Sequence, residues 1–447
     1  MASPEAAPTD AAGPEAPARP ELASTAAVRR APFSDNPRVG TRGRRTQQRI
    51  LDAALKAFGE HGYHRASVDR IAKLAGSSRV SFYQYFASKE DVFRRLAVQV
   101  DRQVAALTEA LNPLTPDEPG HDALHAWVTR YSEIHMRYEP LFHAYETDDA
   151  LASIASQTGA HAVSSFSARV VSPTVPGRQV DVLVRLLLQS LNHTLGVVGL
   201  LRAASPDAYD KDRFDVVVTD VVHRTLFGRV DDVNVHPVGG PPPPALTMSH
   251  ELLEWVQPDD SEASDEPANR ALAALLTAGR QVFVERGFHN TRVEDLVSAA
   301  GVSHGAFYRY FRSKDDLARI LTASAMRAVG TAVTEIPPVS VLQQIDGTSP
   351  LRPWLRRYSA AQAKEAAMLR VWLDAALQDP ALRAQSAPPL DWGRRQLARY
   401  LTPRGFGDPD IDAVYLVGLL GVFGVQPRSG GEIDAAAHII ERGLLGR

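Results

Sequence analysis

Polar and aromatic side chains alternate between Arg79 and Lys89, in an order suited to binding rather than to bond-breaking chemistry. A guanidinium such as that of Arg79 can donate two hydrogen bonds to guanine, a contact that discriminates between bases by roughly 1–3 kcal/mol. The hydroxyl of Ser81 and the amide of Gln84 can bond to base edges or to phosphates. This segment therefore indicates a surface that reads DNA.

The sequence contains none of the enzyme motifs for which we searched. There is no Gly-x-x-x-x-Gly-Lys-Ser/Thr phosphate loop, no Gly-x-Ser-x-Gly elbow and no His-Glu-x-x-His zinc motif. His121 and His125 stand four residues apart but lack a third ligand, so we expect them to be surface residues. The absence of cysteine excludes disulfides and thiolate metal sites. We expect no enzyme activity, no cofactor and no metal.

Short helices must position the segment around Arg79. The apolar residues before Gly62 recur at helical spacing and predict a first helix that ends at this glycine. Ser67 and Ser88 are expected to cap the second and fourth helices, and the third helix is expected at about residues 78–85. Two short helices joined by a tight turn form a helix-turn-helix, whose second helix can enter the DNA major groove.

The same pattern returns 225 residues later. Residues Arg49–Val92 align without a gap on Ala274–Leu317. In the second copy, Thr291 and Glu294 have the spacing of a capping box. The chain is therefore predicted to be a tandem duplication.

Positive charge gathers on both helix-turn-helix segments. Residues 42–89 carry a net charge of +7 and residues 267–314 carry +4, which leaves −14 for the rest of a chain whose total is −3. Such a distribution matches phosphate neutralisation by the two segments. Arg38, Arg42, Arg44 and Arg45 are expected to form a basic arm before the first helix, or else a solvated charged tail.

The segments Ser67–Glu90 and Val293–Lys314 resemble the N-terminal signature of the tetracycline-repressor (TetR) family of bacterial transcription regulators. The resemblance implies an all-α fold with a helical ligand-binding and dimerising domain after each helix-turn-helix. It also implies that Tyr83 and Tyr85 touch the DNA backbone or a thymine methyl group and that Lys89 holds a phosphate. The candidate DNA-binding residues are Arg44, Arg45, Ser67, Ser78, Arg79, Val80, Ser81, Tyr83, Gln84, Tyr85 and Lys89 in the first copy, and Thr291, Ser303, His304, Gly305, Ala306, Tyr308, Arg309, Tyr310 and Lys314 in the second.

The phenylalanines between these residues are predicted to be core instead, namely Phe82, Phe86, Phe307 and Phe311. The two copies differ where specificity should reside. Arg79-Val80-Ser81 becomes His304-Gly305-Ala306, whose shorter side chains predict a less discriminating second module.

Aromatic stripes in the two helical bodies are candidates for an effector site. They comprise Trp127, Tyr131, His135, Tyr138 and Phe142 in the first body, and Trp354, Tyr358, Met368 and Trp372 in the second. Ordinary core packing also explains these stripes, so a pocket for an unknown small molecule is what the resemblance implies.

Two apolar helices are expected near the end of each body, at Val180–Leu201 with Phe214–Phe227 and at Ile411–Val425 with Ile433–Leu445. In the resembled family the last two helices form a four-helix dimer interface, and the glycines from Gly418 to Gly424 would permit close approach. The two bodies of one chain can pair this way as an intramolecular pseudo-dimer, which we favour, or each can pair with its copy in a second chain.

Composition divides the chain into six units: a disordered tail at 1–40, helix-turn-helix domains at 41–95 and 268–320, helical domains at 96–230 and 321–447, and a proline-rich linker at 231–267. We expect no secretory signal and no membrane span, and hence a cytoplasmic protein. The sequence thus predicts a ligand-responsive repressor that binds a double-stranded DNA operator. The alternative is a helical interaction scaffold in which one or both helix-turn-helix modules have lost DNA binding.

Overall fold

The computed structural model describes residues 40–447 except 148–150, 152–160, 172, 207–208, 236–240, 248–266, 289, 343–348, 379 and 425–427. Within this part of the chain every regular element is a helix, and one isolated β-bridge joins Leu114 and Val170. The all-α expectation is confirmed. The tail expected at residues 1–40 lies outside the described residues except for Gly40, as does much of the linker expected at 231–267.

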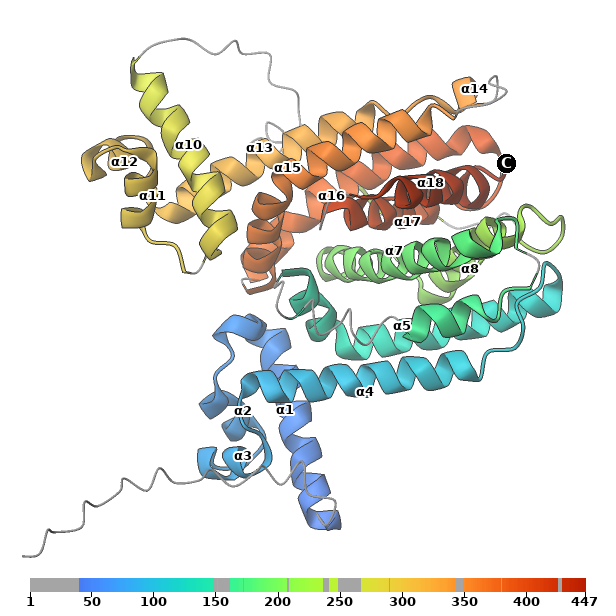
Figure 1. Cartoon of the computed structure of the whole chain (residues 1–447), viewed down its shortest axis with the longest axis horizontal. Helices are drawn as coiled ribbons and strands as arrows, with labels where there is room; N and C mark the ends of the chain where they lie inside the picture. The colour runs from blue at the N-terminus through green and yellow to red at the C-terminus, as the bar shows by residue number, and fades with distance from the viewer. Residues whose placement is uncertain are drawn as a thin grey trace, which may run out of the picture.

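Each copy has short helices that form a compact head and longer helices that form a bundle (Figure 1). The first copy comprises α1 (Thr41–Arg65), α2 (Val68–Leu74), α3 (Arg79–Tyr85), α4 (Lys89–Glu109), α5 (Glu118–Thr147), α7 (Gly177–Ala204) and α8 (Lys211–Phe227). The second comprises α10 (Pro267–Arg286), α11 (Val293–Ala300), α12 (His304–Tyr310), α13 (Lys314–Thr334), α14 (Val339–Leu342), α15 (Leu351–Gln378), α16 (Pro380–Leu401), α17 (Pro409–Gly421) and α18 (Gly430–His438) with the π-helical turn η4 (Ile439–Leu444). We call α1–α3 the first head and α10–α12 the second head.

Serine hydroxyls cap the starts of α2, α3 and α4. Ser67 accepts a hydrogen bond from the backbone of Arg70, and Ser88 accepts one from the backbone of Asp91. Both predicted caps are confirmed. Ser78 caps α3 in the same way, so each of these helix starts is specified by a local residue.

The first helix is interrupted at Gly62, as predicted: this glycine has a non-helical φ of 71° and ψ of 159°, and α1 continues only to Arg65 beyond the kink. Two other local expectations are wrong. The basic residues from Arg42 to Arg45 lie in the opening turns of α1 rather than in an extended arm, since arginine is a good helix former. The capping box predicted for Thr291 and Glu294 does not form. Thr291 instead donates its hydroxyl to the Gly287 carbonyl, and the carboxylate of Asp295 accepts a hydrogen bond from the backbone of Arg292 at the start of α11.

Helices from the two copies pack directly on one another. Helix α7 lies against α16, α17 and α18, and α8 lies against α17 and η4. Gly418 permits close approach as expected, because an added Cβ would lie 2.7 Å from the backbone nitrogen of Thr194. Arg213 on α8 forms an ion pair with Asp408, the N-cap of α17, at 2.6 Å.

The buried apolar residues form two cores. The first head shares one continuous core with both bundles, whereas the second head has its own core with Met368 of α15 packed into it. In Figure 1 both heads lie at one end of the paired bundles, and α4 and α13 run from the heads into them. The two reading helices are thus carried by a single helical body.

The described part of the linker lies on this body. The backbone of Leu246 donates to Asp391 of α16 at 3.0 Å, and the carbonyl of Pro241 accepts from Arg213 at 2.9 Å. One helical stretch, Gln179–Ala204, is long and apolar enough by composition to span a membrane. It is weak evidence of a span, because this stretch of α7 packs against α17 in the core of the paired bundles.

Candidate nucleic-acid interface and ligand cavity

Helix α3 presents a polar surface over an apolar base. Phe82 and Phe86 are fully buried, as predicted, and they pack against each other with ring centroids 5.8 Å apart. Arg79, Val80 and Gln84 are exposed, and Val80 keeps 72% of its surface accessible. The guanidinium of Arg79 lies 3.0 Å from a carboxylate oxygen of Asp69, a neighbour on α2. DNA binding at Arg79 therefore requires exchange of this exposed ion pair for a base or a phosphate.

Helix α12 repeats this arrangement in the second head. Phe307 and Phe311 are buried, as predicted, while His304 and Arg309 are exposed. Tyr308 has 58% of its surface accessible. The imidazole of His304 lies 3.7 Å from Glu294, where the first head has its Arg79–Asp69 pair.

The remaining predicted contacts differ in exposure. The exposed residues are Arg44, Arg45, Ser67, Ser78, Ser303 and Gly305. The half-buried residues are Ser81, Tyr83, Tyr85, Ala306 and Tyr310. Thr291 is buried and bonded to Gly287, so the structure does not offer it to DNA.

Lys89 and Lys314 also differ from the expectation of a phosphate contact. The Lys89 ammonium donates to the Tyr63 carbonyl at 2.6 Å and lies over the Tyr63 ring. The Lys314 ammonium donates to the Phe288 carbonyl at 2.8 Å and to the Thr291 carbonyl at 2.9 Å. Lys89 thus ties the start of α4 to the end of α1, and Lys314 ties the start of α13 to the segment between α10 and α11.

A comparison with known protein families matches both heads. A family model described as "Bacterial regulatory proteins, tetR family" matches residues 50–96 and again residues 275–320. The chain is a tetR-family protein with two tandem modules. The tandem tetR-family protein is 30% identical over 114 residues to the HTH-type transcriptional repressor AcnR of Corynebacterium glutamicum. It is also 41% identical over 71 residues to the uncharacterized HTH-type transcriptional regulator YdgC of Bacillus subtilis, and 39% identical over 102 residues to the HTH-type transcriptional activator FasR of Mycolicibacterium smegmatis.

Each of these alignments covers only part of the two proteins that it compares. They span 24%, 16% and 21% of the tandem protein and 58%, 36% and 45% of AcnR, YdgC and FasR, respectively. The tandem protein therefore spans about half the length of these curated relatives or less. The bundles must be interpreted from their own geometry.

The aromatic stripe of the first bundle packs against itself. Trp127 stacks on Tyr131 with ring centroids 4.8 Å apart, and His135 stacks on Phe142 at 4.3 Å. The hydroxyl of Tyr138 accepts a hydrogen bond from Gln103 at 2.8 Å. A cavity of about 40 Å³ beside His135 is too small for a drug-sized ligand. This stripe therefore has the geometry of a filled core.

The second bundle contains a larger cavity, of about 260 Å³. Of the residues expected there, Tyr358 lines the cavity, whereas Trp354 packs with its indole donating to the Ala332 carbonyl at 2.8 Å. Met368 belongs to the core of the second head, and the side chain of Trp372 lies outside the described residues. The predicted effector site thus lies in the correct bundle, but only one of the four predicted side chains, that of Tyr358, is shown to line the cavity.

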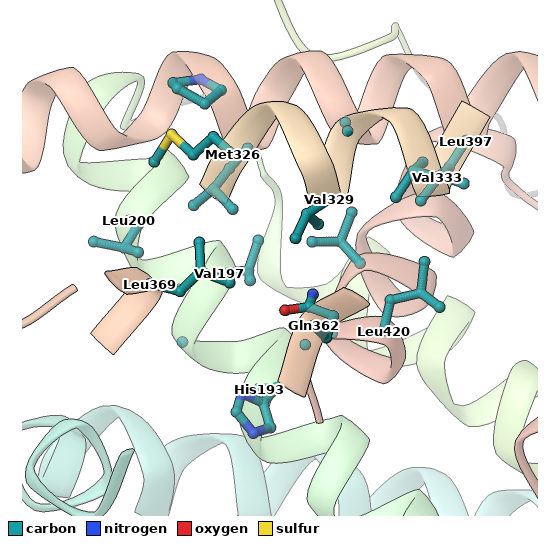
Figure 2. A pocket seen from close by; sticks show the side chains of 18 of the residues that line it. His193, Val197, Leu200, Met326, Val329, Val333, Gln362, Leu369, Leu397 and Leu420 are labelled. Atoms are coloured by element: carbon teal, nitrogen blue, oxygen red, sulfur yellow. The ribbon is translucent and has the colours of Figure 1, made fainter. Parts of the chain in front are cut away.

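Lining residues that sequence reasoning missed come from both copies (Figure 2). Met326, Val329 and Val333 lie on α13 with the spacing of one helix face, a signal that could have found them. His193 and Val197 lie on α7 of the first copy. No local pattern could have placed these two beside α13, since they are more than a hundred residues away in the chain.

His121 and His125 are not the surface residues that were expected. His121 lies 2.7 Å from the buried carboxylate of Asp220, and His125 lies 3.3 Å from the hydroxyl of Thr219. Both partners are on α8, so the two histidines fasten α5 to α8 within the first bundle.

Proposed function

We propose that the tandem tetR-family protein is a sequence-specific DNA-binding transcription regulator, and specifically a ligand-responsive repressor. The observation that carries the proposal is the pair of exposed reading helices, α3 and α12, at one end of a single helical body (Figure 1). The positive charge of both heads supports contact with phosphates. The candidate contacts are the exposed and half-buried residues of the predicted set, with Arg79 as the main base-reading side chain.

We further propose that one chain acts as a pseudo-dimer. A conventional helix-turn-helix dimer places two reading helices one DNA turn apart, roughly 34–36 Å. Here, α7 and α8 of the first copy meet α17 and η4 of the second within the same chain, which supports the pairing of the two modules without a second chain. Because the reading helices have different sequences, the pseudo-dimer suits an asymmetric operator.

The units of this regulator are proposed to be two helix-turn-helix domains, at residues 41–95 and 268–320, and two helical domains, at 96–230 and 321–447, joined by the linker at 231–267. A bound ligand would shift the population of the chain toward a conformer in which the spacing of the two heads no longer matches that of the DNA grooves. We propose that this regulator has no enzyme activity and that it binds its operator in the cytoplasm.

Gel retardation tests the proposal directly. Duplexes selected from a random-sequence pool by the full-length protein are titrated at several salt concentrations, and sedimentation gives the number of chains on each duplex. The proposal expects sequence preference, a steep salt slope and one chain per duplex. Two chains per duplex would overturn the pseudo-dimer alone. If the chain shows neither sequence preference nor a salt slope, it is the interaction scaffold instead. The second head favours this alternative, because Gly305 has no side chain and Ala306 has only a methyl group.

A further inference from the structure

The cavity of the second bundle is bordered on one side by the first copy. Helices α13, α15, α16 and α17 form most of its wall, and α7 contributes His193, Val197 and Leu200. Among the described residues of the first bundle, the space beside His135 is only about 40 Å³, and the larger cleft of about 310 Å³ lies against α1 and is lined by the charged residues Glu139 and Arg202. The two copies are therefore unequal in the feature on which a ligand response depends.

The chemistry of the wall is almost entirely apolar. No aspartate, glutamate, lysine or arginine is among the described residues that line the cavity. Burial lowers the pKa of His193 to about 4, with nearby Arg428 acting in the same direction, so this imidazole is neutral at pH 7. An ionic ligand would lose its hydration without gaining a counter-charge, which is costly.

The wall also contains polar side chains, among them Gln362 of α15 and His143 of α5. The amide nitrogen of Gln362 donates to the hydroxyl of Tyr358, but the amide oxygen Oε1 is buried and unpaired. Gln362 is only 5% exposed and belongs to the cavity lining, and Figure 2 shows its amide among the apolar side chains. A buried carbonyl oxygen without a donor is unfavourable, so a ligand with an N–H or O–H group would be stabilised there.

We infer that the chain binds one neutral, largely apolar ligand bearing a single hydrogen-bond donor, in this cavity shared by the two copies, with the donor directed to Gln362. The inference rests on the proposed ligand response for its regulatory meaning and adds the ligand's chemical class, its stoichiometry and its site. The cavity exceeds the roughly 150 Å³ that holds benzene in an engineered core, so it accommodates a molecule larger than one aromatic ring.

Two fluorescent probes with the same ring skeleton test the chemical class. N-phenyl-1-naphthylamine is neutral and has one N–H donor, whereas 1-anilinonaphthalene-8-sulfonate adds a negative charge to that skeleton. Titration of the full chain without DNA is expected to give one N-phenyl-1-naphthylamine per chain, and the sulfonate is expected to compete at least about tenfold more weakly. Two neutral probes per chain, no binding, or equal competition by the sulfonate would overturn the inference.

Substitutions locate the site. Val329→Phe on α13 and Val197→Phe on α7 each fill the cavity and should abolish binding, while Ile320→Phe, on an exposed position of α13, should leave it unchanged. Gln362→Met is expected to weaken binding about three- to tenfold by removing the acceptor. Unfolding curves of all four variants identify any loss caused by misfolding, and Gln362→Met, which preserves side-chain size, keeps the test informative if the larger replacements unfold the chain.

Binding that survives Val197→Phe in a folded chain would contradict a wall contributed by the first copy. The two proposals can fail separately. If the neutral probe binds once per chain but leaves operator affinity unchanged, the cavity is retained and the ligand-responsive function is contradicted. If a ligand changes operator binding and its effect is the same in Val329→Phe and Val197→Phe, the ligand-responsive function is retained and the cavity is contradicted as the ligand site.

Discussion

Gly418 of α17 approaches Thr194 of α7 so closely that an added Cβ would lie 2.7 Å from the threonine's backbone nitrogen and 2.8 Å from its Cα. These are backbone atoms, which cannot turn aside as a flexible side chain can. The two residues belong to different copies, so the absence of a side chain at position 418 sets how closely the copies pack. Gly443 makes a second such approach, 2.9 Å from the Val221 carbonyl oxygen by the same measure.

Gly418→Ala is therefore expected to destabilise the chain, although alanine favours a helix over glycine. Overpacking of a tight contact costs about 1–3 kcal/mol, which exceeds the gain of roughly 1 kcal/mol or less in helix propensity. Urea unfolding measures the difference. Gly421→Ala is the control, because its added Cβ would lie 3.7 Å from the His193 ring, an ordinary contact. Equal stability of the two variants would show that the copies do not pack at Gly418 in solution.

The ion pair between Arg213 and Asp408 gives a second test of the contact between the copies. Both side chains are largely buried, and Asp408 also caps α17. Asp408→Asn keeps a capping side chain but leaves the Arg213 charge without its partner, so we expect a loss of about 3 kcal/mol in unfolding free energy. Asp434→Asn removes the partner of Arg352 in a pair whose side chains are 29% and 57% exposed, and it should cost at most about 1 kcal/mol. A loss at Asp408 no larger than that at Asp434 would argue against a buried inter-copy pair.

Arg79→Ala is expected to reduce affinity for a selected duplex by about tenfold or more and affinity for unrelated DNA much less. The reason is that a guanidinium bonded to guanine supplies discrimination as well as charge. His304→Ala, the equivalent change in the second head, should have a smaller effect because imidazole cannot make the same two-pronged contact. Fluorescence anisotropy with both duplexes measures the ratio. An equal loss on both duplexes for Arg79→Ala would reassign this residue to a phosphate.

Lys89→Met is expected to act on the first head even without DNA. The Lys89 ammonium donates to the Tyr63 and His64 carbonyls, so its loss leaves these groups without a charged donor and loosens the start of α4. Hydrogen exchange of α1 and α4 amides should accelerate, and DNA affinity should fall on all sequences alike. Lys73→Met, on an exposed residue of α2, is the control for a change of charge. If Lys89→Met has unchanged hydrogen exchange but weaker DNA binding, Lys89 contacts a DNA phosphate rather than stabilising the head.

The heads were predictable from sequence because their determinants are local. Ser67 and Ser88 cap helices within three residues of themselves, and Phe82 and Phe307 recur at the same place in each copy. The cavity was not predictable in this way. Periodicity shows that Trp354 and Tyr358 face inward, but it does not show which of them borders empty space. That depends on α7 docking on α17, a long-range contact for which no short motif exists.

Two buried histidines, His135 and His223, and the cavity-lining His193 predict how stability responds to acid. Burial is the main cause that lowers the pKa of His135 to about 3 and the pKa values of His193 and His223 to about 4. In the unfolded chain a histidine has a pKa of about 6.5, so below that pH the unfolded state binds more protons than the folded state, and stability falls as pH falls. Each histidine should contribute a slope of roughly 1.4 kcal/mol per pH unit between about pH 6 and pH 5.

Urea unfolding across this range measures the slope for the chain and for His135→Met. The variant loses the stack on Phe142 and begins less stable, but its share of the pH dependence should disappear, so the difference in slope rather than the absolute stability carries the test. High salt screens surface charges much more than buried ones, so the difference in slope between the chain and His135→Met should persist at high salt. An unchanged slope in the variant would mean that His135 reaches water in the folded chain, and with it that the core of the first bundle is open rather than filled.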